Sequence, residues 1–459
     1  MPFLYLVFAP VLGVLISDSR KAQRWLFALM VSMPCWPPGR FTFMVLSHEF
    51  YRGHAKGMET SLIEIFGLAL VVASARSKDG RWRLMAPGSV LFLTYCLLCS
   101  LSFFAAEDKM YVLLAASRWF KGVLILMGAF HVIRGAEDLR WGLRSAAISL
   151  IYYAFLCLKL RYVDGYFQIK GYFEHQNPMA MWVYMACVPL LAAGLAPQTK
   201  KGEAMLYLGG VAAGALCTLL TVSRAALAIY AAGCALVVLM AWLRGPTARV
   251  VGITTGAVLG ACLALLFAMD GLNSRLDSMA NSESASEFDL RDILNMQSHA
   301  MLKDSPIGIG WNNFGVMNSR PVGAKYSAIL EEWDESRGFA IVDENYYANP
   351  LTESLYWLIL SETGYPGIIG FVLFISSTLY VASVTWWRYP KQFVGIMAGG
   401  FLVTFVLCYA HGKVERIVVQ PKNLSQWLTS CGIAGALWWR RQLWVRAELP
   451  VKPNPFRLR

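Results

Sequence analysis

Apolar runs alternate with short polar connections along almost the whole chain, from residue 3 to residue 439. A helix needs about 20 mostly apolar residues to cross the hydrocarbon core of a membrane. The pattern predicts membrane-spanning helices at 3–17, 24–36, 61–75, 86–106, 111–133, 142–160, 177–196, 205–222, 225–243, 250–269, 355–387, 393–411 and 425–439. We therefore expect an all-α, polytopic integral membrane protein with about 12–14 transmembrane helices. One long outer (periplasmic) loop, 271–350, is predicted to contain short helices.

The composition agrees with a membrane protein. Of the 459 residues, 57% are apolar and 15% are charged, whereas soluble domains are about 25% charged. Disordered chains, coiled coils and ordinary soluble enzymes are therefore excluded. The ten cysteines lie almost entirely within apolar runs, and Cys96 and Cys99 form a C-x-x-C pair inside one of them. We expect buried structural thiols, not disulfides or zinc ligands.

Basic residues are concentrated in short connections that all fall on one side of the predicted bundle. These connections are 18–24, 76–83, 134–144, 197–204, 244–249, 388–392 and 440–459. Because cytoplasmic loops are enriched in Lys and Arg, this side is predicted to be cytoplasmic. The N-terminus and the loop 271–350 would then lie outside, and the basic C-terminal tail inside. The membrane accounts for the net charge of +12, so nucleic acid is not expected as a partner.

Four groups of polar or charged residues interrupt the apolar pattern, and the predicted topology places all four at the outer face. The first contains Lys159 and Arg161, followed by Gly-Tyr-Phe-Glu-His-Gln-Asn-Pro at 171–178. Glu174 and His175 lie directly before a helix that begins at the Asn-Pro pair. They are candidate functional residues, and capping of the helix is the structural alternative.

Two further groups place cations within apolar helices. Arg224 follows a tight turn and lies at the membrane surface or slightly inside it, where an arginine is costly unless it is paired or faces a polar cavity. Its guanidinium suits a phosphate or diphosphate, and snorkelling to the surface is the alternative. Arg118 and Lys121 lie one turn apart and need anions, for which Glu107 and Asp108 are candidates.

The fourth group lies in the outer loop and the helix after it. A helix is predicted over 288–302, with Leu290, Ile293, Leu294 and Met301 on one face. A polar stripe on another face consists of Arg291, Asn295, Ser298 and His299. The stripe either binds a headgroup at the membrane surface or is solvated. A Gly-rich turn follows at 304–315, without the preceding strand that a nucleotide-binding loop requires.

Two carboxylates, Glu353 and Glu362, lie at or below the membrane surface near the start of the span 355–387. A charge at this depth is costly, so a partner or a chemical role is expected for each. Pairing with a nearby arginine or capping of the helix is the structural alternative.

Together these motifs resemble the O-antigen ligase and polymerase family of bacterial cell-envelope glycosyltransferases. The resemblance rests on S-P-I-G-I-G-W-N-N-F-G at 305–315 and E-S-L-Y-W-L-I-L-S-E-T-G-Y-P-G-I-I-G at 353–370. Upstream lie S-R-A-A at 223–226 and G-Y-F-E-H-Q-N-P at 171–178. The order, spacing and side of these motifs agree over residues 170–390.

The resemblance implies a reaction at the outer face of the bacterial inner membrane. A glycan would move from undecaprenyl diphosphate to an acceptor hydroxyl on lipid A core in ligases, on another lipid-linked repeat in polymerases, or on protein in one branch. No metal, nucleotide or other cofactor is implied. The expected partners are the lipid-linked glycan, an acceptor glycan or lipid, and membrane lipid. The loop 271–350 would cover the glycan and exclude water, with sugars stacking on Trp311, Tyr326, Trp333, Tyr346 and Tyr347.

By this resemblance, arginines hold the diphosphate. Arg224 matches the arginine of the S-R motif, and Arg291 matches the arginine ahead of the P-x-G-x-G turn. Second choices, made from their position at the outer face, are Arg161, Arg118 and Lys121.

The chain departs from the family where the helix that carries Tyr356 begins. The family usually has His-Asn there, and this chain has Glu353-Ser354. Glu353 is therefore the expected catalytic base, with His175 or His299 as alternatives, and it favours a polymerase slightly over a lipid A core ligase. The residues expected to bind the acceptor or glycan are Glu174, His175, His299 and Tyr356.

We expect a transmembrane bundle over 1–160, an O-antigen ligase-like core over 161–439 and a basic cytoplasmic tail over 440–459. A transporter or flippase of a lipid-linked glycan is the alternative function. It should carry charges near the membrane midplane and helices broken there, whereas the charges here gather at one face. A non-catalytic scaffold of an envelope complex is a further alternative, which would keep its function without Arg224, Arg291 and Glu353.

Overall fold

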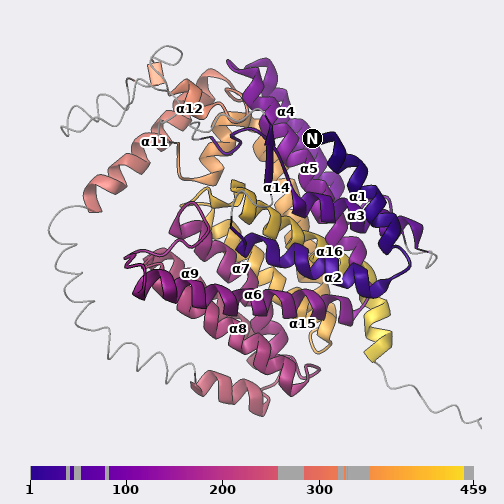
Figure 1. The fold of residues 1–459 in the computed structure, drawn as a ribbon. Helices are drawn as coiled ribbons and strands as arrows, with labels where there is room; N and C mark the ends of the chain where they lie inside the picture. The colour runs from indigo at the N-terminus through magenta and orange to yellow at the C-terminus, as the bar shows by residue number, and fades with distance from the viewer. Residues whose placement is uncertain are drawn as a thin grey trace, which may run out of the picture.

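The computed structural model describes residues 2–37, 42–45, 53–77, 82–256, 284–318, 325–326, 328 and 351–448. These residues form a bundle of α-helices (Figure 1). The helices are α1 (Pro2–Ile16), α2 (Arg20–Ser32), α3 (Leu62–Arg76), α4 (Ser89–Ser100), α5 (Lys109–Val132), α6 (Ala136–Tyr162), α7 (Gln176–Leu195), α8 (Lys201–Leu220), α9 (Arg224–Leu243), α11 (Ser284–Asp304), α12 (Phe314–Met317), α14 (Leu355–Arg388), α15 (Phe393–His411) and α16 (Pro421–Glu448). The predicted all-α polytopic fold is confirmed.

Each predicted span has a matching helix, except 250–269, of which only 250–256 lies within the described residues. Seven of the described helices are long and apolar enough to cross a membrane: α5, α6, α7, α8, α9, α14 and α15. α16 continues to Glu448, so the first part of the predicted tail is helical. One element was not predicted, an antiparallel ribbon of β1 (Thr42–Val45) and β2 (Met58–Ser61). Its strands are too short to give a clear alternating pattern.

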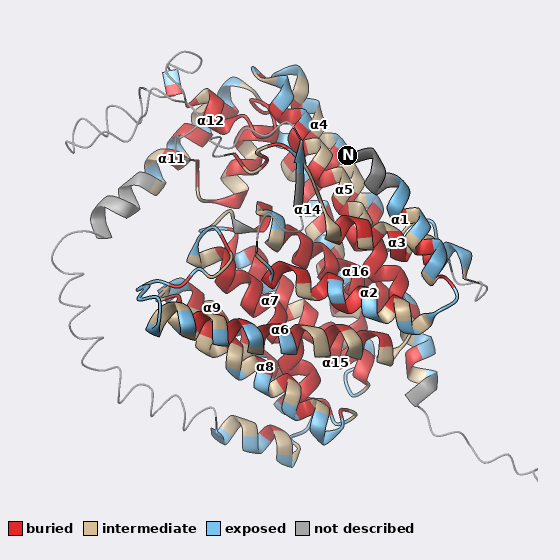
Figure 2. Ribbon diagram, viewed as in Figure 1, coloured by how far each residue is buried: buried red, intermediate tan, exposed pale blue. Residues whose placement is uncertain are grey.

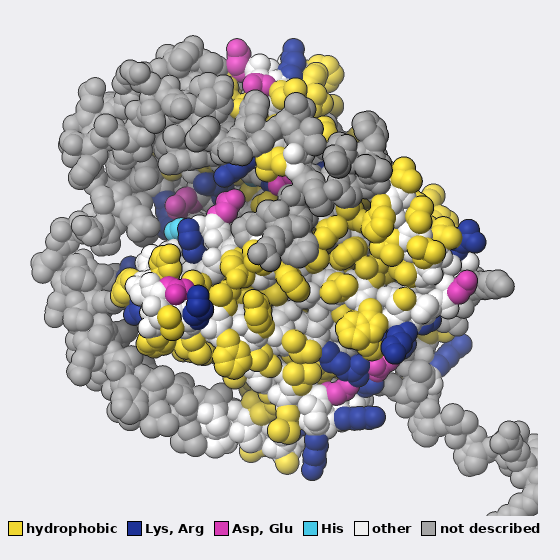
Figure 3. All heavy atoms as spheres, in the orientation of Figure 1, with side chains coloured by type: hydrophobic (Ala, Val, Ile, Leu, Met, Phe, Trp, Pro, Cys, Tyr) yellow, Lys and Arg dark blue, Asp and Glu magenta, His cyan; other side chains and the backbone are white. Residues whose placement is uncertain are grey.

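Burial separates the inner helices from the outer ones. The 18-residue apolar stretch of α7 is entirely buried. α7 packs against α8, α9 and α15 (Figure 2). Outer helices instead expose large apolar side chains, among them Phe155 at 67% and Leu243 at 75%. Yellow apolar side chains cover much of the face in Figure 3. An apolar surface of this extent indicates contact with lipid.

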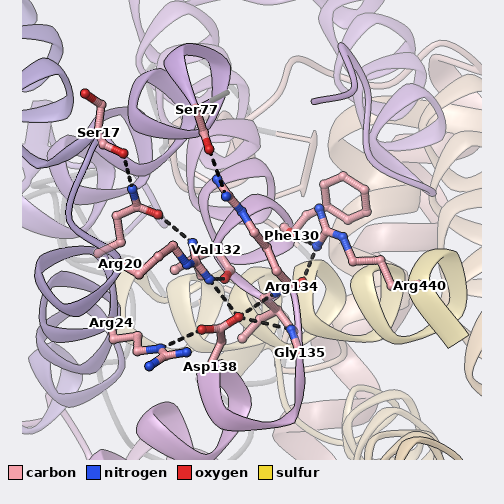
Figure 4. Close-up of polar contacts among 12 residues, drawn as sticks. Ser17, Arg20, Arg24, Ser77, Phe130, Val132, Arg134, Gly135, Asp138 and Arg440 are labelled. Atoms are coloured by element: carbon pink, nitrogen blue, oxygen red, sulfur yellow. Dashed lines mark hydrogen bonds and ion pairs between the residues drawn. The ribbon is translucent and has the colours of Figure 1, made fainter. Parts of the chain in front are cut away.

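The basic connections gather at one end of the bundle, which we call the basic end. Asp138 pairs there with Arg20 and Arg24, each at 2.7 Å, and accepts hydrogen bonds from the backbone N–H groups of Arg134 and Gly135 (Figure 4). The Gln198 side chain likewise donates to a carbonyl in the connection 388–392. The connections 18–24, 134–144, 197–204 and 388–392, which the sequence assigned to one side, therefore do lie together. We call the opposite end the site end.

At the site end, the Gly-rich turn packs into a break in α14. Pro366 has no N–H to donate to the carbonyl of Glu362 one turn earlier, and Gly364 adopts φ +62° and ψ −162°. The freed carbonyl of Glu362 accepts from the N–H of Gly310 at 3.1 Å, and the Tyr365 N–H donates to Pro306 O at 2.9 Å. The break therefore anchors the outer loop to the spanning helix.

Candidate active site

The polar stripe of α11 faces the start of α14. The Arg291 guanidinium forms an ion pair with Glu353 through Nε. The His299 ring lies edge-on to the ring of Trp357, with centroids 6.0 Å apart, and Ser298 is fully buried. The sequence left headgroup binding and solvation as roles for this stripe. In the structure the stripe is partly packed against another helix: Arg291 is paired within the protein but 34% exposed, and His299 is exposed.

A second carboxylate approaches the same arginine from the connection between α15 and α16. Glu415 Oε1 lies 3.7 Å from Arg291 Nη2 and accepts a hydrogen bond from Asn177 Nδ2 at 2.6 Å. Its side chain is 15% exposed, compared with 36% for Glu353. Arg291 therefore lies between two carboxylates that come from separate segments of the chain.

The neighbouring Arg416 fixes the segment that carries Glu353. Its Nη1 donates to the carbonyls of Leu351 and Thr352 at 2.8 and 2.9 Å, directly before the Glu353-Ser354 pair. Burial lowers the pKa of Arg416, and the nearby carboxylates, Glu353 and Glu415 foremost, act in the opposite direction. Because its donors are used on the backbone, we interpret Arg416 as the residue that positions this segment.

Arg118 and Lys121 pair with carboxylates of β2 and of the first turn of α3. Arg118 forms an ion pair with Glu59, and Lys121 contacts the Glu59 carbonyl and lies 3.7 Å from the Glu64 carboxylate. The expected partners Glu107 and Asp108 are not used here. A helix rises 1.5 Å per residue, so position 118 lies about 15 Å below position 108. Asp108 instead caps α5 by accepting from its own first turn.

The buried Glu362 side chain has its partners within the protein. Its carboxylate is 2% exposed and accepts from the backbone N–H of Phe314 at 3.2 Å, and its other oxygen lies 3.7 Å from His54 Nδ1. His54 is 3% exposed; its burial, together with the charges of Arg118 and Arg416, lowers its pKa to about 3. The neutral imidazole and the backbone contact explain how the Glu362 side chain is accommodated, and they differ from the arginine pair or helix cap of the structural alternative.

Glu174 and His175 lie at the same end, before α7. The Glu174 side chain is 64% exposed and lies 3.9 Å from Lys56 Nζ. His175 is the N-cap residue of α7, and its partial burial lowers its pKa, while the charge of Glu353 opposes the shift. Both lie near the Glu353 segment, and the His175 side chain makes no hydrogen bond that caps α7.

The remaining expected residues have separate positions. Arg224 is exposed at the first residue of α9. Arg161 donates to carbonyls of its own loop at residues 166–167. Tyr356 Oη donates to Tyr409 O at 2.7 Å, which ties α14 to α15. Arg161 and Tyr356 thus have structural contacts that the sequence did not reveal.

The prediction that aromatic side chains of the loop stack on sugars is wrong for the two of them that the structure describes, Trp311 and Tyr326. Trp311 is 2% exposed and packs on the rings of Trp119 and Tyr95. Tyr326 is 6% exposed, with its hydroxyl on Asp304. Buried rings cannot present a face to a sugar. Trp333, Tyr346 and Tyr347, and most of the loop 271–350, lie outside the described residues.

The sequence analysis missed Glu415, Arg416 and His54. The signal was present in H-G-K-V-E-R at 411–416, a charged run between two apolar spans on the predicted outer side. Within the described ranges, no three His, Cys, Asp or Glu side chains are grouped as a metal site requires.

Comparison with known proteins bears on the predicted resemblance. A family model described as O-antigen ligase matches residues 209–372, which include Arg224, Arg291 and Glu353 but neither Glu415 nor His54. No curated protein matches the chain. The resemblance predicted from the motifs is confirmed: within a multi-pass membrane fold, residues 209–372 are similar to the O-antigen ligase family.

Proposed function

We propose that this protein is a glycosyltransferase that moves a glycan from undecaprenyl diphosphate to an acceptor hydroxyl at the outer face of the inner membrane. The observation that carries the proposal is the Arg291–Glu353 pair, which lies inside the family match and at the end of the bundle opposite the basic connections. Since basic connections mark the cytoplasmic side, the site would face outward, with the N-terminus outside and the C-terminus inside.

The reaction needs a cation for the leaving group. When the bond between the glycan and the diphosphate breaks, negative charge develops on the diphosphate, and fixed guanidinium groups stabilise it. A guanidinium has five N–H donors, so Arg291 can hold phosphate oxygens beside its contact with Glu353. Arg224 is the second proposed ligand. Arg118 and Lys121 become less suitable, because their side chains are 7% and 24% exposed, compared with 34% for Arg291.

The acceptor hydroxyl must lose a proton as it attacks the anomeric carbon. The sequence analysis predicted Glu353 as the base that takes this proton. The replacement of His-Asn by Glu353-Ser354 favours a polymerase, whose acceptor is another lipid-linked glycan, over a lipid A core ligase. Direct displacement would invert the anomeric configuration.

The test is transfer by the purified protein. It would be incubated with an undecaprenyl-diphosphate oligosaccharide, with and without a lipid A core acceptor, and products would be read by gel and mass spectrometry. A ladder of longer lipid-linked glycans identifies a polymerase, and one discrete shift that requires the acceptor identifies a ligase. Bound donor without transfer under either condition would refute the proposal and favour a transporter.

Single substitutions test whether Arg291 takes part in the transfer reaction. Arg291→Ala should lower the rate by about 10²–10³-fold, the usual loss when one donor to a developing charge is removed. Lys303→Gln is the matched control, since it removes an exposed cation from the same helix. An unchanged rate in Arg291→Ala would remove Arg291 from the site.

A further inference from the structure

Glu415 lies where a proton acceptor for the transfer reaction would be needed. It follows α15 on a short connection and reaches the α11–α14 junction, where its carboxylate lies 3.7 Å from Arg291 Nη2. Asn177, at the start of α7, donates to Oε1 at 2.6 Å. Four parts of the chain therefore converge on one guanidinium and two carboxylates.

The two carboxylates are held differently. Glu353 forms a direct ion pair with Arg291 Nε, so protonating it would break the contact that holds the guanidinium. Glu415 accepts a hydrogen bond from the neutral side-chain amide of Asn177. Its carboxylate lies 3.7 Å from Arg291 Nη2, beyond direct hydrogen-bond distance. It can take up a proton while the Arg291–Glu353 pair and the hydrogen bond from Asn177 stay intact.

The surroundings of Glu415 also suit proton transfer at neutral pH. Burial and the neighbouring Glu353 charge raise the pKa of Glu415 to about 7, while Arg291, Arg416 and the hydrogen bond from Asn177 act in the opposite direction. A general base works best when its pKa lies near the working pH, because it is then both deprotonated and basic enough.

We propose that Glu415 is the general base of the transfer reaction and that Glu353 positions Arg291, an inference that rests on the proposed function. The acceptor oxygen forms its bond to the anomeric carbon as its proton passes to a Glu415 carboxylate oxygen. The bond from that carbon to the diphosphate oxygen breaks, and its electron pair leaves with the undecaprenyl diphosphate beside Arg291. Glu415 then returns its proton to water.

The test compares Glu415→Gln with Glu353→Gln. The amide introduced by Glu415→Gln retains an oxygen that can accept from Asn177, so the fold should be preserved. We expect Glu415→Gln to lower kcat by about 10²–10⁴-fold with little change in donor KM. We expect Glu353→Gln to raise donor KM, because Arg291 loses its anchor. Lys413→Gln, which removes an exposed cation from the same connection, is the control.

The pH profile supplies a readout that a structural role would not move. In the unmodified protein, kcat/KM should fall on the acid side with a midpoint near pH 7, and the residual activity of Glu415→Gln should not show this fall. Glu353→Gln should keep the fall, with its midpoint at lower pH, because the Glu353 charge no longer raises the pKa of Glu415. Absence of the fall in Glu353→Gln alone would make Glu353 the base and overturn the proposal. So would an unchanged rate and an unchanged fall in Glu415→Gln.

The two proposals fail differently. If the unmodified protein binds the lipid-linked donor but transfers nothing, the proposed function is refuted and the role of Glu415 with it. If the unmodified protein transfers glycan and Glu415→Gln does so equally well, only the role of Glu415 is refuted. Thermal melting of each purified variant in detergent separates loss of chemistry from loss of fold.

Discussion

Gly364→Ala should detach the Gly-rich turn from α14. A Cβ at position 364 would lie 2.2 Å from Pro306 O, 2.4 Å from Ile307 C and 2.5 Å from Gly308 N. All three are backbone atoms, which cannot rotate away as a side chain would. The backbone at Gly364, with φ +62° and ψ −162°, is also in a region that is essentially confined to glycine.

The expected cost follows from these two effects. A residue with a side chain in this backbone region costs about 1–3 kcal/mol, and overpacking of a tight contact costs about 1–3 kcal/mol more. Releasing the turn would relieve the contact but break three backbone hydrogen bonds, from Ile309, Gly310 and Tyr365, worth about 1 kcal/mol each. Local stability should therefore fall by about 3 kcal/mol.

Amide hydrogen exchange measures this loss directly. A loss of about 3 kcal/mol corresponds to exchange about 100-fold faster in peptides that contain the N–H groups of Ile309, Gly310 and Tyr365. The matched control is Gly165→Ala: Gly165 has φ +77° but no atom within 4 Å of an added Cβ. Exchange in these peptides that is equal in both variants and in the unmodified protein would refute the reasoning.

Three further outcomes are expected. Arg416→Gln should lower the thermal midpoint in detergent, because a charged donor to two carbonyls is worth about 1.5–3 kcal/mol, whereas Arg388→Gln, exposed at the far end of α14, should leave it unchanged. Arg118→Met or Glu59→Met alone should destabilise by about 3–5 kcal/mol by leaving a buried charge, and the double variant should recover much of this; additive losses would contradict the pairing. The pKa of His54, lowered to about 3, means that the unfolded chain takes up a proton below about pH 6.5 that the folded protein does not. His54 should therefore contribute a loss of stability of about 2 kcal/mol between pH 7 and pH 5, opposite in sign to the contribution of Glu415, whose pKa is raised to about 7. The difference in stability between the unmodified protein and His54→Asn should fall by about this amount over the same range.

The helices could be predicted from sequence because the length of an apolar run determines whether it spans a membrane. The predicted span 111–133 and the helix Lys109–Val132 agree closely for this reason. The ribbon at Thr42–Val45 and Met58–Ser61 could not be predicted. Its short strands are held by cross-strand pairing rather than by a pattern within either segment.

The site was predictable in part. The motifs identified Arg291 and Glu353 as functional candidates, and the structure brings them into contact. Topology alone assigns a connection to one side of the membrane but does not say which connections adjoin, so the approach of Glu415 could not be foreseen. Trp311 shows the opposite error, since an aromatic residue in a polar loop was expected at the surface and is buried against α4 and α5.

The convergence of distant segments on Arg291 has a consequence for biosynthesis. The cluster needs Asn177 in the first half of the chain and Glu415 and Arg416 near its end. A nascent chain that has inserted every helix up to α14 still lacks the connection that holds the Glu353 segment in place. The last helix pair to leave the ribosome, α15 and α16, therefore completes the cluster, and a partly synthesised chain would lack the contacts that Glu415 and Arg416 make.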